Sequence, residues 1–452
     1  MSNKIVLTKG LDLPVTGAAE LRVTKTVTPD VVAICPADFP GLVPRLLVKE
    51  GDPVLCGSPV LSDKKNPEIL IASPASGTVR QVVRGEKRKL LAVLIQADTR
   101  QQYLDFGAKK PQGLDAAQVK AALLESGLWP FILQRPYGII ANPAVQPKAI
   151  FVSAFDTAPL AACPEFTLGD RIADIQAGAD ALGLLTEGGV HVGLNAANCG
   201  GTPFAKLEGV VFHVFEGKHP AGNVGVQISH VCPVTKGSTV WTVSLQGLAA
   251  IGSLFRTGKL NLRRKIAVGG PAAIECAYAD LLPGTPMKAL AGFAGNSDDV
   301  RIVSGNILTG TNAGPDGYVG FYANEVTIIK EGYEEELFGW LNPVRPKVFS
   351  HDRSALTWLL RGKKFDMDTN IHGGPRAFVM GDGYYGKVVP MDIFPLYLIK
   401  ACLAGDIDKM EQFGIYEVVP EDLALCEVID PSKNYIQEII ANGISLMLKE
   451  ME

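Results

Sequence analysis

Strand-like and helix-like runs alternate between residues 149 and 268, and this alternation restricts the possible folds more than any other feature of the chain. Short apolar runs typical of buried strands occupy residues 149–154, 190–194, 210–215, 239–244 and 265–268. Apolar residues at helical spacing lie between them, in residues 171–186 and 245–255. Such alternation predicts a parallel sheet covered by helices on both faces, and these sheets usually bind ligands beyond the carboxyl ends of their strands.

A loop rich in glycine and in hydrogen-bond donors follows the predicted strand 210–215, within residues 213–234. Its notable residues are Gly217, Lys218, His219, Gly222, Asn223 and Gly225. Glycine lets the backbone approach a ligand closely, and Lys, His and Asn supply donors, which suits an anionic or carbonyl-bearing ligand. A purely structural loop whose glycines only form turns is the alternative. No G-x-G-x-x-G follows any predicted strand, so the usual dinucleotide site is not indicated.

Residues 36–98 read as a small all-β unit, because short β-prone runs are separated by Gly, Pro, Asn and Asp turns. The runs Val48-Lys-Glu-Gly-Asp-Pro-Val and Ala72-Ser-Pro-Ala-Ser-Gly-Thr-Val resemble the barrel-sandwich fold of biotinyl and lipoyl carrier domains. In carriers a lysine at the hairpin tip is acylated, and Lys64 or Lys65 lies near that place. Asp63 and Asn66-Pro67 flank the two lysines in place of the small or methionine neighbours of a modified lysine. We therefore expect an unmodified, structural barrel.

The remaining segments complete a multidomain α/β and α+β protein. Residues 4–27 read as an irregular lead-in, residues 269–331 as a small α+β unit, and helices are predicted in residues 114–126, 396–403, 407–413 and 435–449. We predict domains at residues 1–100, 101–260, 261–332 and 333–452.

Composition excludes several classes of protein. The chain has 452 residues with 43 basic and 47 acidic side chains, so its charge gives no case for a nucleic-acid partner. Its eight cysteines, at positions 35, 56, 163, 199, 232, 276, 402 and 426, form no C-x-x-C pair, and no local metal signature is present. Residues 237–255 are the best candidate membrane span, but they are interrupted by polar residues and glycines and read instead as a strand and a helix. We expect reduced thiols and no transmembrane segment.

Several motifs, in order along the chain, resemble the NqrA family, the A subunits of the Na+-translocating NADH:quinone reductases, which is related to RnfC and to the NADH-oxidising flavin subunit of respiratory complex I. The motifs are Asp63-Lys-Lys-Asn-Pro, Ala72-Ser-Pro-Ala-Ser-Gly-Thr-Val, His219-Pro-Ala-Gly-Asn-Val-Gly, Ser304-Gly-Asn-Ile-Leu-Thr-Gly, Phe338-Gly-Trp, Met391-Asp-Ile-Phe-Pro, Ala404-Gly-Asp-Ile-Asp and Glu421-Asp-Leu-Ala-Leu-Cys. The resemblance implies a barrel-sandwich unit, a Rossmann-like α/β domain, an SLBB-like β-grasp domain and a helical C-terminal domain.

The chain departs from these relatives in ways that bear on function. Its C-terminal region carries only Cys402 and Cys426, too few for the iron–sulfur cluster of RnfC and of the complex I protein. The glycine-rich flavin and NADH loops of the complex I protein are not readable, so we do not expect the chain to oxidise NADH alone. The family's central Gly-Thr-His-Ile-His is here Gly225-Val-Gln-Ile-Ser-His230, which displaces or removes a histidine.

The resemblance implies a peripheral protein on the cytoplasmic side of the bacterial inner membrane, assembled with the other subunits of the reductase and implicated in quinone binding. The candidate quinone-binding residues are Lys218, His219, Gly222 and Asn223. We expect no catalytic side chain, no metal site and no tightly bound cofactor in this chain, and we assign Tyr384 and Tyr385 to packing or subunit contact. A stand-alone flavin- or NAD-dependent oxidoreductase, a biotin or lipoyl carrier and a purely structural scaffold are the alternatives.

Overall fold

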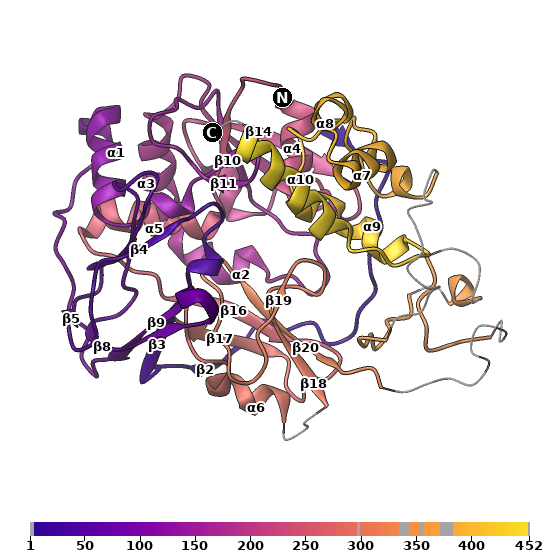
Figure 1. The fold of residues 1–452 in the computed structure, drawn as a ribbon, viewed down its shortest axis with the longest axis horizontal. Helices are drawn as coiled ribbons and strands as arrows, with labels where there is room; N and C mark the ends of the chain where they lie inside the picture. Colours follow the sequence, from indigo (N-terminus) through magenta and orange to yellow (C-terminus); the bar gives the residue numbers. More distant parts are fainter. Residues whose placement is uncertain are drawn as a thin grey trace.

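The structure is a computed structural model that describes residues 4–295, 299–333, 338, 341, 344–351, 356–360, 362–370 and 383–450 (Figure 1). Its largest sheet has seven strands in the order β1-β14-β13-β12-β15-β10-β11. These strands are β1 Lys4–Val6, β14 Val210–Glu216, β13 Val190–Asn195, β12 Ile150–Ser153, β15 Val240–Thr242, β10 Leu133–Arg135 and β11 Ile139–Ile140. The first five run parallel, as the alternation predicted, and β10 and β11 add an antiparallel edge.

Helices cover both faces of this sheet because successive strand residues point to opposite sides. On one face Ile150 and Val152 belong to the same core as helices α3 Ile172–Gly183 and α5 Leu245–Thr257. On the other face Phe151 packs with Ile228 of helix α4 Val224–Val231. The helices predicted at 171–186 and 245–255 are thereby confirmed, whereas the loop expected through residue 234 ends at Asn223, where α4 begins.

Helices α3 and α5 cross at two glycines. A Cβ at Gly178 would lie 2.2 Å from the Leu248 carbonyl oxygen, and one at Gly252 would lie 1.7 Å from that of Asp174. Both distances are shorter than any real contact, so glycine is what lets the two backbones approach this closely. The crossing fixes the helix layer on which the sheet rests.

The N-terminal barrel has the two sheets expected of a barrel-sandwich unit. One contains β3 Val31–Ile34, β9 Leu90–Ala97, β8 Gly77–Arg84 and β5 Pro53–Val54; the other contains β4 Pro44–Leu46, β6 Pro59–Asp63 and β7 Leu70–Ala72. Lys64 and Lys65 are exposed at the tip of the β6–β7 hairpin, and buried Asp63 accepts hydrogen bonds from the Val43 and Asn66 amides. Helix α1 Ala116–Glu125 follows the barrel and begins at Asp115 in a capping box with Gln118, as predicted.

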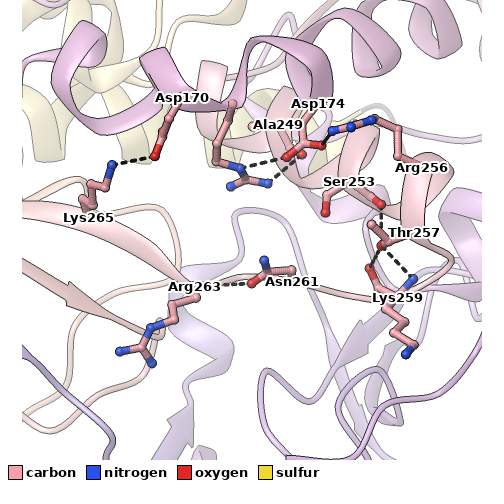
Figure 2. Close-up of polar contacts among 11 residues, drawn as sticks. Asp170, Asp174, Ala249, Ser253, Arg256, Thr257, Lys259, Asn261, Arg263 and Lys265 are labelled. Carbon is pink, nitrogen blue, oxygen red and sulfur yellow. Dashed lines mark hydrogen bonds and ion pairs between the residues drawn. The ribbon is translucent and has the colours of Figure 1, made fainter.

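A six-stranded sheet forms the next unit, in the order β19-β18-β20-β16-β17-β2. Its strands are β19 Thr311–Asn312, β18 Val300–Ser304, β20 Glu325–Lys330, β16 Arg264–Gly269, β17 Ala277–Leu281 and β2 Val23–Thr26. The apolar run at 265–268, which the alternation placed in the first sheet, therefore belongs to this second one. Lys265 of β16 pairs with Asp170 at 2.9 Å where the two sheets meet (Figure 2). Beside this pair, Arg171 forms an ion pair with Asp174 at 3.0 Å.

The N-terminal segment is not the irregular lead-in that the sequence suggested. Strand β1 pairs with β14 at the edge of the seven-stranded sheet, and β2 pairs with β17 in the six-stranded sheet. The two strands are only three and four residues long and have partners more than 200 residues away, so no local pattern announces them.

Four helices near the C-terminus gather beside β14 and α4 (Figure 1). They are α7 Pro395–Ala404, α8 Ile407–Phe413, α9 Ala424–Ile429 and α10 Ile436–Glu450. Three of them were predicted, and α9 was not. They share a core with Leu7, Phe215 and Tyr385, which confirms packing as the role of Tyr385. Of the motif Phe338-Gly-Trp, the last two residues lie outside the described residues.

Candidate functional site

The loop between β14 and α4 is held by its own hydrogen bonds. The Gly222 amide donates to the Thr157 hydroxyl at 2.9 Å, and that hydroxyl lies 3.1 Å from Nδ1 of His219. The His219 amide donates to Asp12 Oδ1 at 2.9 Å, and the Asn223 amide donates to the Pro220 carbonyl. These backbone amides are therefore used within the loop itself.

The four predicted site residues separate into two groups. His219, Gly222 and Asn223 line a cavity, whereas Lys218 is exposed and lies outside its lining. His219 is only 4% exposed, and this burial lowers its pKa, so the ring is neutral at physiological pH. Asn223 precedes the first residue of α4, and its side-chain amide donates to the Glu421 carbonyl oxygen at 3.4 Å.

The cavity has a volume of about 840 Å³ and lies beyond the carboxyl ends of the parallel strands, where the alternation predicted a site. Ser153 at the end of β12, Thr242 at the end of β15 and the first residues of α5 form its floor. Lys265 and Glu325 of the six-stranded sheet form one wall, and one face of helix α10 forms another. Three units that are far apart in the sequence thus enclose a single space.

Much of the cavity lining is apolar. Its apolar lining residues include Phe131, Leu133, Ile139, Phe155, Leu168, Val224, Val243, Leu245, Leu308, Val419, Ile444 and Leu448. On α10 the lining positions Gln437, Ala441, Ile444 and Leu448 recur every three or four residues, so they form one continuous face of the helix. These apolar residues can accommodate a flat ring or an aliphatic chain.

The cavity lining also includes an ion-pair network. Arg135, 3% exposed, donates to Asp422 Oδ2 at 2.6 Å and to Glu421 Oε1 at 3.1 Å. The network joins β10 of the seven-stranded sheet to the short helix Pro420–Leu423 that precedes α9. Partial burial and the neighbouring Asp422 raise the pKa of Glu421, whose side chain is 43% exposed, and Arg135 opposes the rise.

Glu325 lies on the wall formed by the six-stranded sheet. Its side chain accepts a hydrogen bond from the Ala162 amide at 3.1 Å, and the residue is 6% exposed. Burial, with the nearby negative charge of Asp156, raises the pKa of Glu325 to about 8. Gln246 at the start of α5 is also 6% exposed and lines the cavity, and within the described residues its side-chain amide has no hydrogen-bond partner. Neutral carboxyl groups and a free amide are hydrogen-bond donors suited to a carbonyl oxygen.

The sequence reasoning missed Arg135, Gln246, Glu325 and Glu421. Two signals were present. Glu325 opens the apolar run Glu325-Val-Thr-Ile-Ile, where a charge at the start of a buried strand is unusual. Glu421 stands in the motif Glu421-Asp-Leu-Ala-Leu-Cys, which had been noted only for its resemblance to the family.

Comparison with known proteins agrees with this architecture. Residues 5–98 match the NqrA N-terminal barrel-sandwich hybrid domain, and residues 114–260 match the NqrA second alpha/beta domain. The A subunit of the Na(+)-translocating NADH-quinone reductase of Serratia proteamaculans is 38% identical over 99% of this chain and 100% of its own length. This chain belongs to the NqrA family. The NqrA proteins of Vibrio vulnificus and Yersinia pestis are 36% and 38% identical over 99% and 95% of the chain, and over 100% and 96% of their own lengths.

Membership of the NqrA family confirms the resemblance read from the motifs, together with the barrel-sandwich unit and the second α/β domain. A solved NAD+-reducing [NiFe]-hydrogenase covers 75% of this NqrA chain and 64% of its own, with 12% identity and a TM-score of 0.40, which is too low to support an inference.

Two further structural findings concern this NqrA family member. Within the described ranges, no helix combines the length and hydrophobicity required to cross a membrane. Among the same residues, no three His, Cys, Asp or Glu side chains are arranged to hold a metal ion. The eight cysteines are free, and Cys56 and Cys426 are buried.

Proposed function

We propose that this chain is the peripheral, quinone-binding component of a membrane-bound Na+-translocating NADH:quinone reductase, placed on the cytoplasmic side of the bacterial inner membrane and coupled to sodium export through its partner subunits. The relatives' name mentions both NADH and a quinone. The structure offers one large cavity among its described residues to which either could be assigned. The charges of that cavity favour the quinone.

The charge distribution is the observation that carries the proposal: among the described residues that line the cavity, each Lys and Arg side chain is already ion-paired. Arg135 is bound to Asp422 and Glu421, Lys265 is bound to Asp170, and His219 is neutral. Asp156, Glu325 and Glu421 line the same space. A nucleotide brings negative phosphates, and the carboxyl groups of Asp156 and Glu421 in the same lining would repel them. A quinone is neutral and needs only donors for its carbonyl oxygens.

The combination of apolar residues with a few polar groups in the cavity lining supports the same ligand. The donors Gln246, Asn223 and the neutral carboxyl group of Glu325 can hold the carbonyl oxygens of the ring. Ile444 and Leu448 on α10, with Leu308, can then contact the aliphatic tail. This arrangement matches ligand sites in which an apolar pocket carries a few placed polar groups. The proposed quinone site is therefore the enclosed cavity that His219 lines, and not the exposed part of the loop at Lys218.

The proposal makes NADH oxidation by the isolated chain unexpected, because the lining residues that the structure describes do not favour a dinucleotide. The chain then contributes to the oxidoreductase only when assembled with its partner subunits, and it carries no tightly bound cofactor of its own.

Titration with a short-chain benzoquinone tests the assignment, with binding followed by calorimetry and by quenching of tryptophan fluorescence. Ala441→Trp fills the cavity from α10 and is expected to weaken binding at least tenfold. Asn442→Trp places the same side chain at the adjacent exposed position and is the matched control. NADH and flavin mononucleotide are expected to give no saturable heat. Equal quinone binding by both variants, or tight binding of NADH, contradicts the assignment.

A further inference from the structure

Glu325 is the most buried of the three carboxyl groups that line the cavity. Its residue is 6% exposed, whereas Glu421 keeps 43% of its side chain exposed and Asp156 is an exposed residue. Two donors reach Glu325, the Ala162 amide at 3.1 Å and the side chain of Asn306. Within the described part of the chain, no Lys, Arg or His forms an ion pair with it.

The charged groups around Glu325 do not compensate a negative charge. On its own sheet, Lys265 of β16 is bound to Asp170 at 2.9 Å, and Tyr278 of β17 is neutral because burial raises its pKa. Across the cavity, Asp156 follows β12 and repels a second negative charge.

The charged residues around Glu421 also supply no cation that would stabilise the charged form of Glu325. There Glu421 lies beside Arg135, whose guanidinium also serves Asp422. At the other end of β20, Glu331 is neutralised by Arg301 at 2.7 Å. Burial without a cation therefore favours the protonated form of Glu325.

We infer that Glu325, in its neutral form, is the hydrogen-bond donor to a quinone carbonyl in this cavity, and that quinone binding is lost when Glu325 ionises. The inference rests on the proposed function and adds the group that recognises the ring. A protonated carboxyl group donates one hydrogen bond to a carbonyl oxygen, whereas a carboxylate can only accept and would repel its lone pairs.

Quinone affinity is therefore expected to fall as the pH rises. Below the pKa of Glu325, which burial and Asp156 raise to about 8, the donor is present and binding is at its full strength. Above that value each pH unit weakens binding by about tenfold, because one proton must be restored before the quinone binds. Removing the charge of Asp156 lowers the pKa of Glu325, so the loss of affinity then begins at a lower pH.

Benzoquinone titrations between about pH 6 and pH 10 test the inference on the full-length chain. The wild type is expected to lose affinity with rising pH, and Glu325→Gln, which keeps a donor at every pH, is expected to bind with a nearly constant Kd. Asp156→Asn is expected to move the wild-type loss to lower pH, and it supplies a second test that leaves Glu325 in place. Glu331→Gln, one residue beyond the end of β20 and outside the cavity lining, is expected to follow the wild type.

The outcomes separate the two proposals. Saturable binding that Ala441→Trp weakens, but that is independent of pH in the wild type, refutes the role of Glu325 and leaves the quinone site intact. Loss of the pH dependence in Glu421→Gln but not in Glu325→Gln refutes it as well. Absence of quinone binding at every pH refutes both the site and the role of Glu325.

Discussion

Replacing Arg135 is expected to separate the C-terminal helices from the seven-stranded sheet. Arg135 is buried on β10, and its guanidinium is bound to Asp422, whose side chain has no solvent exposure, and to Glu421. In Arg135→Met the Asp422 carboxylate keeps the Val419 amide as a donor but loses its counter-ion. Breaking a buried pair by removing one partner costs about 3–5 kcal/mol, because an uncompensated charge stays buried. That is a large part of the roughly 5–15 kcal/mol by which domains are usually stable.

A double-mutant cycle distinguishes this charge effect from lost packing. Arg135→Met with Asp422→Asn removes both charges, so the pair is expected to recover most of the stability that Arg135→Met alone loses. Urea titration followed by tryptophan fluorescence reports on Trp129 and Trp241 in the α/β core, and pulse proteolysis reports on release of the C-terminal helices. A loss below about 1 kcal/mol in Arg135→Met, or a double mutant no more stable than the single one, would refute the reasoning.

Four further predictions follow from other parts of the structure. Folding raises the pKa of Glu325, so between about pH 5 and about pH 8 the folded protein keeps a proton on Glu325 that the unfolded chain releases. The wild-type thermal midpoint should therefore fall as the pH rises through this range, and the midpoint of Glu325→Gln should not. Gly252→Ala should lower the free energy of unfolding by at least about 1–3 kcal/mol through its contact with the Asp174 carbonyl, whereas Gly183→Ala in α3, which meets open space, should be neutral or stabilising in the same urea titration. Intact mass spectrometry of protein from the native host should find Lys64 and Lys65 unmodified, and a biotinyl or lipoyl adduct would contradict the structural barrel. Metal analysis and a visible spectrum should show no stoichiometric iron or zinc and no colour.

The sequence predicted the elements whose signals are local. Helix α1 has its capping box, α10 has regular apolar spacing, and the parallel strands are apolar runs bounded by turns, so each was found within a few residues. Elements whose stability comes from distant partners were not found. Strand β1 is three residues long and exists because Lys4 to Val6 pair with Val214 to Glu216. Strand β16 looks like any other buried strand, and only its pairing with β17 and β20 assigns it to the second sheet.

The position of the cavity, but not most of the residues that line it, could be expected from the sequence, for the same physical reason. The position beyond the strand ends follows from the parallel topology, and His219, Gly222 and Asn223 do line the cavity. Lys218 is one residue away from His219 yet points outside, because a loop closed by the hydrogen bonds of Thr157 and Asp12 turns adjacent side chains in different directions. Arg135, Glu325 and Glu421 come from three units, and their proximity exists only in the folded chain.

The N-terminal segment forms hydrogen bonds with each of the three units that enclose the cavity. Residues 4–27 pair with β14 of the first sheet, and the Gly10 amide donates to the Lys387 carbonyl near the C-terminal helices. Farther along, the Gly270 amide donates to the Gly17 carbonyl, and β2 joins the six-stranded sheet. One continuous segment is thus bonded to every unit that contributes a cavity wall. These bonds hold the units in the arrangement that encloses the cavity, so we expect the cavity to be present without a ligand and its affinity to depend on the groups that line it.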